Sequence, residues 1–106
     1  MVAVLMTDLE GSTAMAQRLG PVAAEELRAE HFALLRGALE RTGGREVKTL
    51  GDGLMVVFDG AAQSLACAAQ MQQAIEARNR RADEKLGVRI GVSLGDTRFD
   101  DGDSVR

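Results

Sequence analysis

The stretch REVKTLGDGLMVVF, residues 45–58, decides the fold class of this chain. Its first half alternates polar and apolar residues from Glu46 to Leu50, and its second half, Leu54 to Phe58, is apolar throughout. Gly51-Asp52-Gly53 separates the halves, and an Asp-Gly step between two β-rich runs is typical of a tight hairpin turn. We therefore predict an antiparallel hairpin over 45–58 whose second strand is buried.

Strand and helix signals flank the hairpin on both sides. The other elements expected, in chain order, are a strand at 2–6, helices at 13–19 and 22–41, a helix from an N-cap at Asp59 to about residue 78, and a strand at 86–95. Thr13 ends the Gly-Ser-Thr turn before the first helix and is expected to cap it. From Asp96 onward the sequence is acidic and turn-like, without periodicity.

The resulting order, β-α-α-β-β-α-β, predicts an α+β sandwich of the ferredoxin-like kind, with helices on one face of a sheet. A doubly wound parallel sheet is the alternative. The hairpin argues against that alternative because it breaks a strict alternation of strand and helix.

Composition narrows the class of protein. A length of 106 residues is that of one domain, and the net charge of −3 lacks the basic footprint of a general nucleic-acid binder. Cys67 is the only cysteine, so no internal disulfide can form, and we expect it to be a buried, inert thiol. The apolar run Met1 to Met6 is far shorter than a membrane span, so we expect a soluble, cytoplasmic chain with no membrane association from this segment.

Asp8 and Asp52 are the candidates for chemistry. Asp8 stands where the first strand ends, and Asp52 stands at the tip of the hairpin. If these strands are neighbours, the two carboxylates can converge into a hard-oxygen site that suits Mg²⁺ or Mn²⁺. The helix that follows Asp8 would point free N–H groups at a phosphate in the same corner. Both residues are also common in ordinary turns, so spacing alone leaves a structural role open.

Three further residues carry weaker signals. Lys48, one of only two lysines, is a candidate donor to a purine ring, although a charged residue on a strand is more often on its solvated face. His31 lies on the apolar stripe of a helix and is expected to be structural. The charged run 78–85 is expected to be solvated surface.

Three motifs together resemble one family. Residues 7–13 (TDLEGST), 47–53 (VKTLGDG) and 88–96 (VRIGVSLGD) are similar, in this order, to the class III adenylyl/guanylyl cyclase catalytic domain, in its bacterial branch. The resemblance runs from about residue 3 to residue 96. This resemblance supports a metal-binding role for Asp8 and Asp52 much more strongly than their spacing alone does.

The resemblance implies a reaction and a set of roles. Asp8 and Asp52, with the carbonyl of Leu9, would hold two Mg²⁺ or Mn²⁺ ions. The corner that contains Gly11, Ser12 and Thr13 would face the triphosphate, and Lys48 would favour ATP over GTP. The ribose 3′-oxygen would attack the α-phosphate and give cyclic AMP and pyrophosphate, as in intracellular signalling. Family members act as dimers that share each site between two chains.

The sequence departs from the family pattern after Gly95. The family continues through a second base-selecting residue, then an Asn and an Arg that act on the ribose and the transition state, whereas this chain stops at Arg106. We therefore expect residues 1–106 to be a cyclase domain that lacks its C-terminal part and is poorly active alone. It would pair with itself or with a complete cyclase chain. Leu54 also replaces a frequent aromatic residue and Ser93 a frequent histidine.

Three alternatives stay open. The first is a guanylate cyclase, because only one of the two base-reading positions is present. The second is a non-catalytic cyclase-like module for dimerisation or regulation. The third is another nucleotidyl transferase with paired carboxylates, such as a cyclic dinucleotide synthase, which Lys48 and the Gly-Asp-Gly turn make less favourable.

Overall fold

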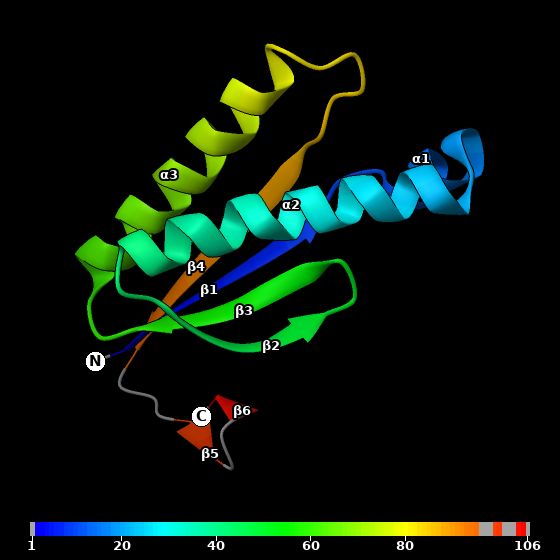
Figure 1. Ribbon diagram of the computed structural model, residues 1–106. Coiled ribbons are helices and arrows are strands. Elements are labelled where there is room, and N and C mark those ends of the chain that lie inside the picture. The colour runs from blue at the N-terminus through cyan, green and yellow to red at the C-terminus, as the bar shows by residue number, and fades with distance from the viewer. Residues whose placement is uncertain (1, 96–98, 101–103, 106) are drawn as a thin grey trace.

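The computed structural model describes residues 2–95, 99–100 and 104–105. Its elements, coloured along the chain in Figure 1, are β1 (Val2–Leu9), α1 (Ser12–Leu19), α2 (Pro21–Arg41), β2 (Arg45–Leu50), β3 (Gly53–Phe58), α3 (Ala61–Asn79), β4 (Val88–Gly95), β5 (Phe99–Asp100) and β6 (Ser104–Val105). The order up to β4 is the predicted one. The predicted α+β sandwich and the hairpin at 45–58 are both confirmed.

Four strands form one antiparallel sheet in the order β2-β3-β1-β4. The run Leu54 to Phe58 is buried because β3 lies inside the sheet, between β2 and β1. The more polar β2 occupies an edge of the sheet. The sequence difference between the two arms of the hairpin therefore places each arm in the sheet.

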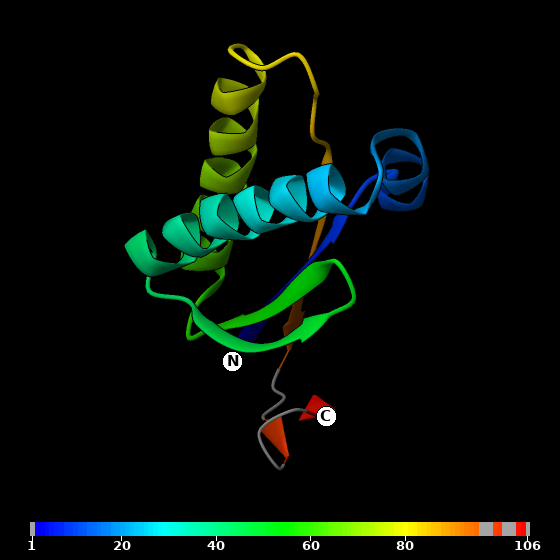
Figure 2. The same ribbon diagram turned by 45° about the vertical axis from the view of Figure 1, so that its right-hand side comes forward.

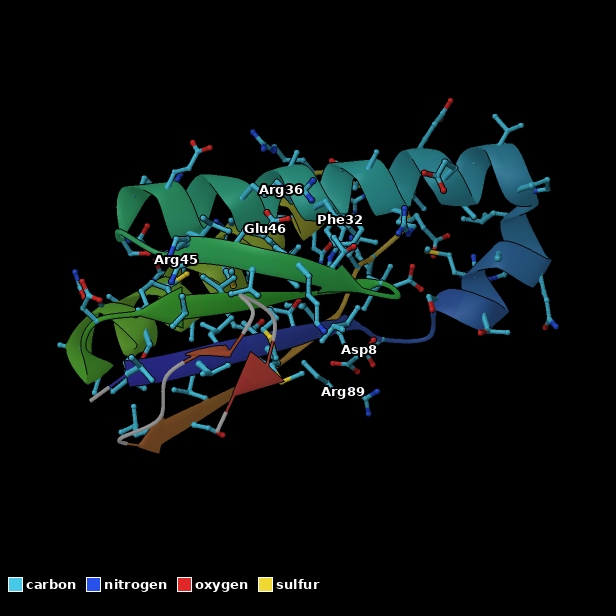
Figure 3. All side chains as sticks on the ribbon, turned by 90° about the horizontal axis from the view of Figure 1, so that it is seen from below. Asp8, Phe32, Arg36, Arg45, Glu46 and Arg89 are labelled. Carbon is cyan, nitrogen blue, oxygen red and sulfur yellow. The ribbon has the colours of Figure 1, made fainter. Side chains whose placement is uncertain are left out.

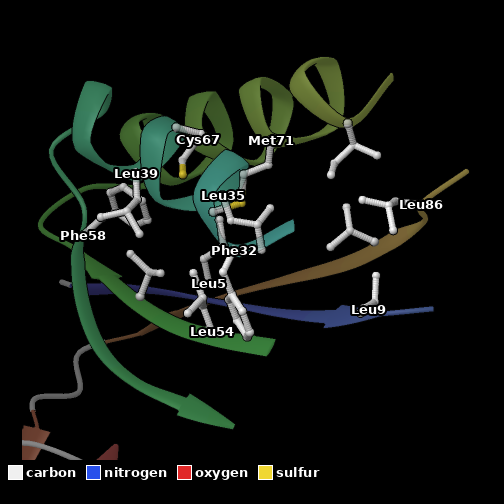
Figure 4. Packing of buried hydrophobic residues seen from close by; sticks show 14 of the residues in the cluster. Leu5, Leu9, Phe32, Leu35, Leu39, Leu54, Phe58, Cys67, Met71 and Leu86 are labelled. Atoms are coloured by element: carbon white, nitrogen blue, oxygen red, sulfur yellow. The ribbon is translucent and has the colours of Figure 1, made fainter. Parts of the chain in front are cut away.

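Helices α2 and α3 pack on one face of this sheet, as Figure 2 shows from the side. The core between them holds Leu5 and Leu54 from the strands, Leu35 from α2 and Met71 from α3, all fully buried (Figure 4). Cys67 is also in this core, and burial raises the pKa of its thiol, so the predicted buried thiol is confirmed. Helix α1 packs mainly against α2 and lies past the end of β1 (Figure 1).

The opposite face of the sheet carries the other half of each strand's side chains, because side chains alternate along a strand. On β1 this half includes Met6 and Asp8, which are both exposed, whereas Leu5 and Leu9 face the helices. Arg89 pairs with Asp8 in the sheet register and Lys48 pairs with Met55, so both project on the face of Asp8. We call this surface the open face.

Four local predictions were wrong. Arg78, at the start of the charged run expected to be solvated surface, is buried and pairs with Glu30. Thr13 does not cap α1, because the helix begins at Ser12 and its N-cap is Gly11 in the left-handed region (φ 64°). Asp59 does not cap α3, since the N-cap is Gly60 in extended backbone. Beyond Asp96, part of the segment expected to be turn-like forms the short antiparallel pair β5–β6. Residues 96–98 and 101–103 lie outside the described residues.

Among the described residues, the helices are all too short or too polar to cross a membrane. The cytoplasmic location stays a prediction.

Candidate functional site

Gly53 is the point at which the hairpin meets β1. A Cβ atom there would overlap the carbonyl group of Thr7 and come within 3.4 Å of the Cα atom of Asp8. The Thr7 hydroxyl also accepts a hydrogen bond of 2.9 Å from the backbone N–H of Leu54. The turn that carries Asp52 is therefore packed directly against the end of β1 that carries Asp8. The sheet brings together the backbones of the two predicted metal-binding residues.

The carboxylate of Asp52 is held from the helix side. Arg28 on α2 donates from Nε to Oδ1 of Asp52 at 2.7 Å, and from a second nitrogen to the carbonyl of Gly51 at 3.2 Å. Ser12, at the start of α1, hydrogen-bonds the same carboxylate. These bonds, with that of Ser12 the stronger influence, keep the pKa of Asp52 below its usual value, so the group is ionised at neutral pH.

His31 holds the main chain of the same turn. Its Nε2 lies 3.0 Å from the carbonyl oxygen of Asp52, and its side chain is fully buried. Burial lowers the pKa of His31, while the charges of Asp52 and, more weakly, Asp8 act to raise it. Both carboxylates are therefore close enough to this imidazole to influence it. The predicted burial of His31 is confirmed, but its contact with the carbonyl of Asp52 was not predicted.

Asp8 is held more loosely. Its side chain is 53% exposed on the open face, and Arg89 of β4 donates to its Oδ2 at 2.8 Å from a side chain that is itself 71% exposed. Figure 3 shows the two side chains together at one end of the sheet. An exposed pair of this kind contributes little to stability, so the carboxylate of Asp8 can exchange its partner readily.

The predicted phosphate corner follows Asp8 directly in the sequence and leads into α1. Leu9 is buried and pairs with Val88 in the sheet, and Gly11 makes the sharp entry into α1. No side chain of the described residues caps this helix, so its first-turn N–H groups have no side-chain acceptor. Thr13 is exposed within the first turn.

A pocket of about 210 Å³ opens beside this corner, between α1 and α2. Leu9, Ser12, Arg28 and Asp52 are among its lining residues, and Asp8 is not. The carboxylate of Asp52 thus faces the pocket, whereas that of Asp8 faces the open side of the sheet with Arg89.

The residues present fit a hard divalent cation in their chemistry. Carboxylate and main-chain carbonyl oxygens are what Mg²⁺ and Mn²⁺ prefer, and Asp8, Asp52 and Leu9 offer them from adjoining segments of backbone, with the two carboxylates turned to different sides. Within residues 2–95 and the two short strands, no three or more His, Cys, Asp or Glu side chains are grouped as a ready metal site. Each carboxylate is instead partnered by one arginine, whose positive charge a cation would have to replace.

Sequence reasoning did not find the residues that hold the two carboxylates. Arg28 is 24 residues from Asp52 and Arg89 is 81 residues from Asp8, so only the tertiary fold pairs them. One signal was available for α2. Arg28 and His31 are three residues apart, which places two polar groups side by side on α2.

Comparisons with known proteins agree on one family. Residues 1–100 match the family described as "Adenylate and Guanylate cyclase catalytic domain". The chain is 33% identical over 105 residues to "Putative adenylate cyclase 3" of Rhizobium meliloti, which covers 97% of this chain and 18% of that protein. It is 31% identical over 115 residues to "Adenylate cyclase" of Schizosaccharomyces pombe, over 91% of this chain and 7% of that protein.

Solved structures give the same result. A crystal structure titled "Adenylate/Guanylate Cyclase/Hydrolase" from Silicibacter pomeroyi superposes with a TM-score of 0.81 at 33% identity, over 96% of this chain and 60% of that chain. The guanylyl cyclase Cya2 gives the same TM-score at 22% identity, which shows a shared fold. The chain therefore spans less than two thirds of the relatives it matches.

Proposed function

The chain belongs to the adenylate and guanylate cyclase catalytic domain family, and on this premise we propose that it forms the metal-binding half of an adenylate cyclase site. The reaction would convert ATP to cyclic AMP and pyrophosphate by attack of the ribose 3′-oxygen on the α-phosphate. The observation that carries the proposal is the contact of Gly53 with β1, which sets the Asp52 turn against Asp8.

Asp8, Asp52 and the carbonyl of Leu9 would hold two Mg²⁺ or Mn²⁺ ions. When bound, these ions supply charge neutralisation on the phosphate and activation of the attacking hydroxyl. The chain's own contribution is to supply two carboxylates from adjoining segments of the backbone. The lowered pKa of Asp52 supports this role, because the group stays ionised, and able to bind a cation, at a lower pH than an ordinary aspartate does.

The triphosphate would lie along the first turn of α1. Gly11 leaves the entry to the helix without a side chain, and the first-turn N–H groups, including those of Ser12 and Thr13, would face the anion. The uncapped start of the helix supports this placement. The positive end of the helix dipole adds to the attraction.

Lys48 would select the base. It lies on the open face, on the same side of the sheet as Asp8, so one nucleotide could extend from the metal corner along this face. A guanylate cyclase is the alternative, since structures titled as adenylate cyclases and as guanylyl cyclases share this fold. The partner would be a second copy of the chain or another cyclase chain that completes the site. A non-catalytic module for dimerisation or regulation is the other alternative.

The test measures cyclic nucleotide formation from ATP and from GTP in Mn²⁺ buffer. The chain is assayed alone and mixed with a full-length cyclase that has both of its own metal-binding aspartates replaced by Asn. We expect cyclic AMP from the mixture, and none when this chain carries Asp8→Asn or Asp52→Asn. Cyclic GMP in place of cyclic AMP would favour the guanylate alternative. Pairing without any cyclic product would favour the non-catalytic module.

A further inference from the structure

The turn at Gly51–Gly53 needs support from outside the sheet. It joins β3 to β2, which lies at the sheet edge and has a neighbour on one side only. Gly51 is exposed and has a φ of 60°. Glycine adopts this conformation without strain, but its conformational freedom leaves the turn without local rigidity. The position of Asp52 therefore depends on what the rest of the fold contributes to this turn.

Helix α2 supplies that support through two residues one turn apart. Arg28 bonds the carboxylate of Asp52 and the carbonyl of Gly51, and His31 bonds the carbonyl of Asp52. The two residues differ in what a cation would do to them. A cation on the Asp52 carboxylate competes with Arg28, whereas the carbonyl that His31 binds takes no part in that competition.

The state of His31 follows from its partner. A carbonyl oxygen only accepts hydrogen bonds, so Nε2 of His31 must carry the proton and donate it. The ring is fully buried beside Phe32, with a centroid distance of 5.0 Å. Nδ1 is buried too and has no hydrogen-bond partner among the described residues. A neutral imidazole with one unpaired nitrogen is a costly group to bury, and an apolar residue would avoid that cost.

We infer that His31 is a positioning residue for Asp52: its Nε2–H fixes the main chain of the turn, so that the carboxylate keeps its position after a cation has displaced Arg28. The inference rests on the proposed function, since the aim of Asp52 matters only if it binds a cation. It adds a residue outside the metal's immediate ligands, of the kind that tunes affinity by orienting a ligand.

The test measures Mn²⁺ binding to the chain. Binding is monitored as the decrease of the electron paramagnetic resonance signal of free Mn²⁺. His31→Leu removes the donor and fills the space with an apolar side chain, and it should weaken Mn²⁺ binding about tenfold. His31→Gln restores an N–H at a similar reach and should bind within about threefold of the unsubstituted chain. Thr42→Val, which deletes a side-chain bond to the carbonyl of Ala38 at the other end of α2, is the matched control and should bind normally.

Stability separates positioning from simple packing. The urea midpoint of His31→Leu should stay within about 0.5 M of that of the unsubstituted chain, because the lost hydrogen bond is offset by removal of the unpaired Nδ1. A role in packing alone would instead lower the midpoint and leave the Mn²⁺ affinity of the folded protein intact. Equal Mn²⁺ binding by the Leu variant, or binding by the Gln variant as weak as that of the Leu variant, would overturn the inference.

Nuclear magnetic resonance keeps the inference separate from the proposed function. Imidazole ¹⁵N signals should show His31 protonated at Nε2 and unprotonated at Nδ1, and the amide signals of Asp52 and Gly53 should broaden in His31→Leu but not in His31→Gln. A chain that binds no Mn²⁺ but shows these signals refutes the metal site and retains the ordering of the turn by His31. Protonation at Nδ1 in place of Nε2, or unchanged amide signals in the Leu variant, refutes the ordering itself.

Discussion

The end of β1 and the turn between β2 and β3 adjoin in the fold but hold their carboxylates in different ways. Asp52 has bonds from Ser12 and Arg28 on its carboxylate and from His31 on its carbonyl. Asp8 has one exposed partner, Arg89, on the open face of the sheet. One carboxylate is therefore fixed by the fold before any ligand arrives, while the other is free to adjust to what binds.

This difference suggests how a two-carboxylate site can be both ordered and adaptable. The fixed group sets the position of a cation, and the exposed group completes its coordination at little cost in stability. The four predictions below test the contact that joins the two regions, the unequal support of the two carboxylates, the competition at Asp52 and the part of Ser12.

The largest effect is expected where the two regions touch. Gly53→Ala places a Cβ atom into the carbonyl group of Thr7, which is backbone and can move only with β1. We expect a loss of at least about 3 kcal/mol of unfolding free energy, measured by urea denaturation. Gly91→Ala on β4 is the control, because a Cβ there meets nothing within 4 Å. Similar losses in both variants would show that the contact at Gly53 is not what joins hairpin and strand.

The second prediction separates the carboxylates. Asp52→Asn weakens charge-assisted hydrogen bonds from Ser12 and Arg28 and should cost about 1–2 kcal/mol of unfolding free energy. Asp8→Asn loses only an exposed ion pair and should stay within about 0.5 kcal/mol of the unsubstituted chain. Both variants should lose Mn²⁺ binding. A larger stability loss for Asp8→Asn would reverse the comparison between the two regions.

The sequence predicted most of the fold because its signals are local. The alternation from Glu46 to Leu50, the Asp-Gly turn and the apolar run to Phe58 specify a hairpin from neighbouring residues alone. The helix starts were less predictable, since glycine and polar residues compete for the same cap. Gly11 and Gly60 are the N-caps of α1 and α3, where Thr13 and Asp59 were expected.

The candidate site was predictable only in part. Three motifs marked Asp8, Lys48 and Asp52 through their resemblance to a family, and the sheet then placed Asp8 beside the turn. The arginines that hold the two carboxylates carry no motif, because each is a tertiary contact between distant segments. The apolar stripe on α2 predicts a buried His31, but burial alone does not reveal what a ring nitrogen contacts.

The third prediction concerns the competition at Asp52. Arg28→Met keeps an unbranched side chain over Phe32, which the guanidinium now covers at 4.8 Å, and removes the charge that a cation must displace. Mn²⁺ affinity should rise about threefold, because the cation no longer has to replace a partly exposed ion pair, whose free energy is of that size. The direction is opposite to that expected for His31→Leu. Weaker Mn²⁺ binding by Arg28→Met would show that Arg28 supports the site rather than competing with the cation.

The smallest effect is expected from Ser12, whose hydrogen bond does most to lower the pKa of Asp52. A carboxyl group with a folded pKa below its unfolded value stabilises the fold above the unfolded pKa, and this contribution is lost as the pH falls through the folded pKa. Ser12→Ala moves the folded pKa of Asp52 upward, towards its ordinary value. The variant should therefore be slightly less stable at neutral pH and should lose less stability on acidification.

Urea unfolding between about pH 7 and pH 3 measures this difference, which should stay below about 1 kcal/mol because Asp52 is partly exposed. Thr13→Ala removes the neighbouring hydroxyl and is the matched control, with the pH dependence of the unsubstituted chain expected. If Ser12→Ala and Thr13→Ala lost stability in parallel at every pH, the hydroxyl of Ser12 would be acting on α1 rather than on Asp52. The support of Asp52 would then come from α2 alone. Its advantage over Asp8 would rest on Arg28 and His31, without a contribution from α1.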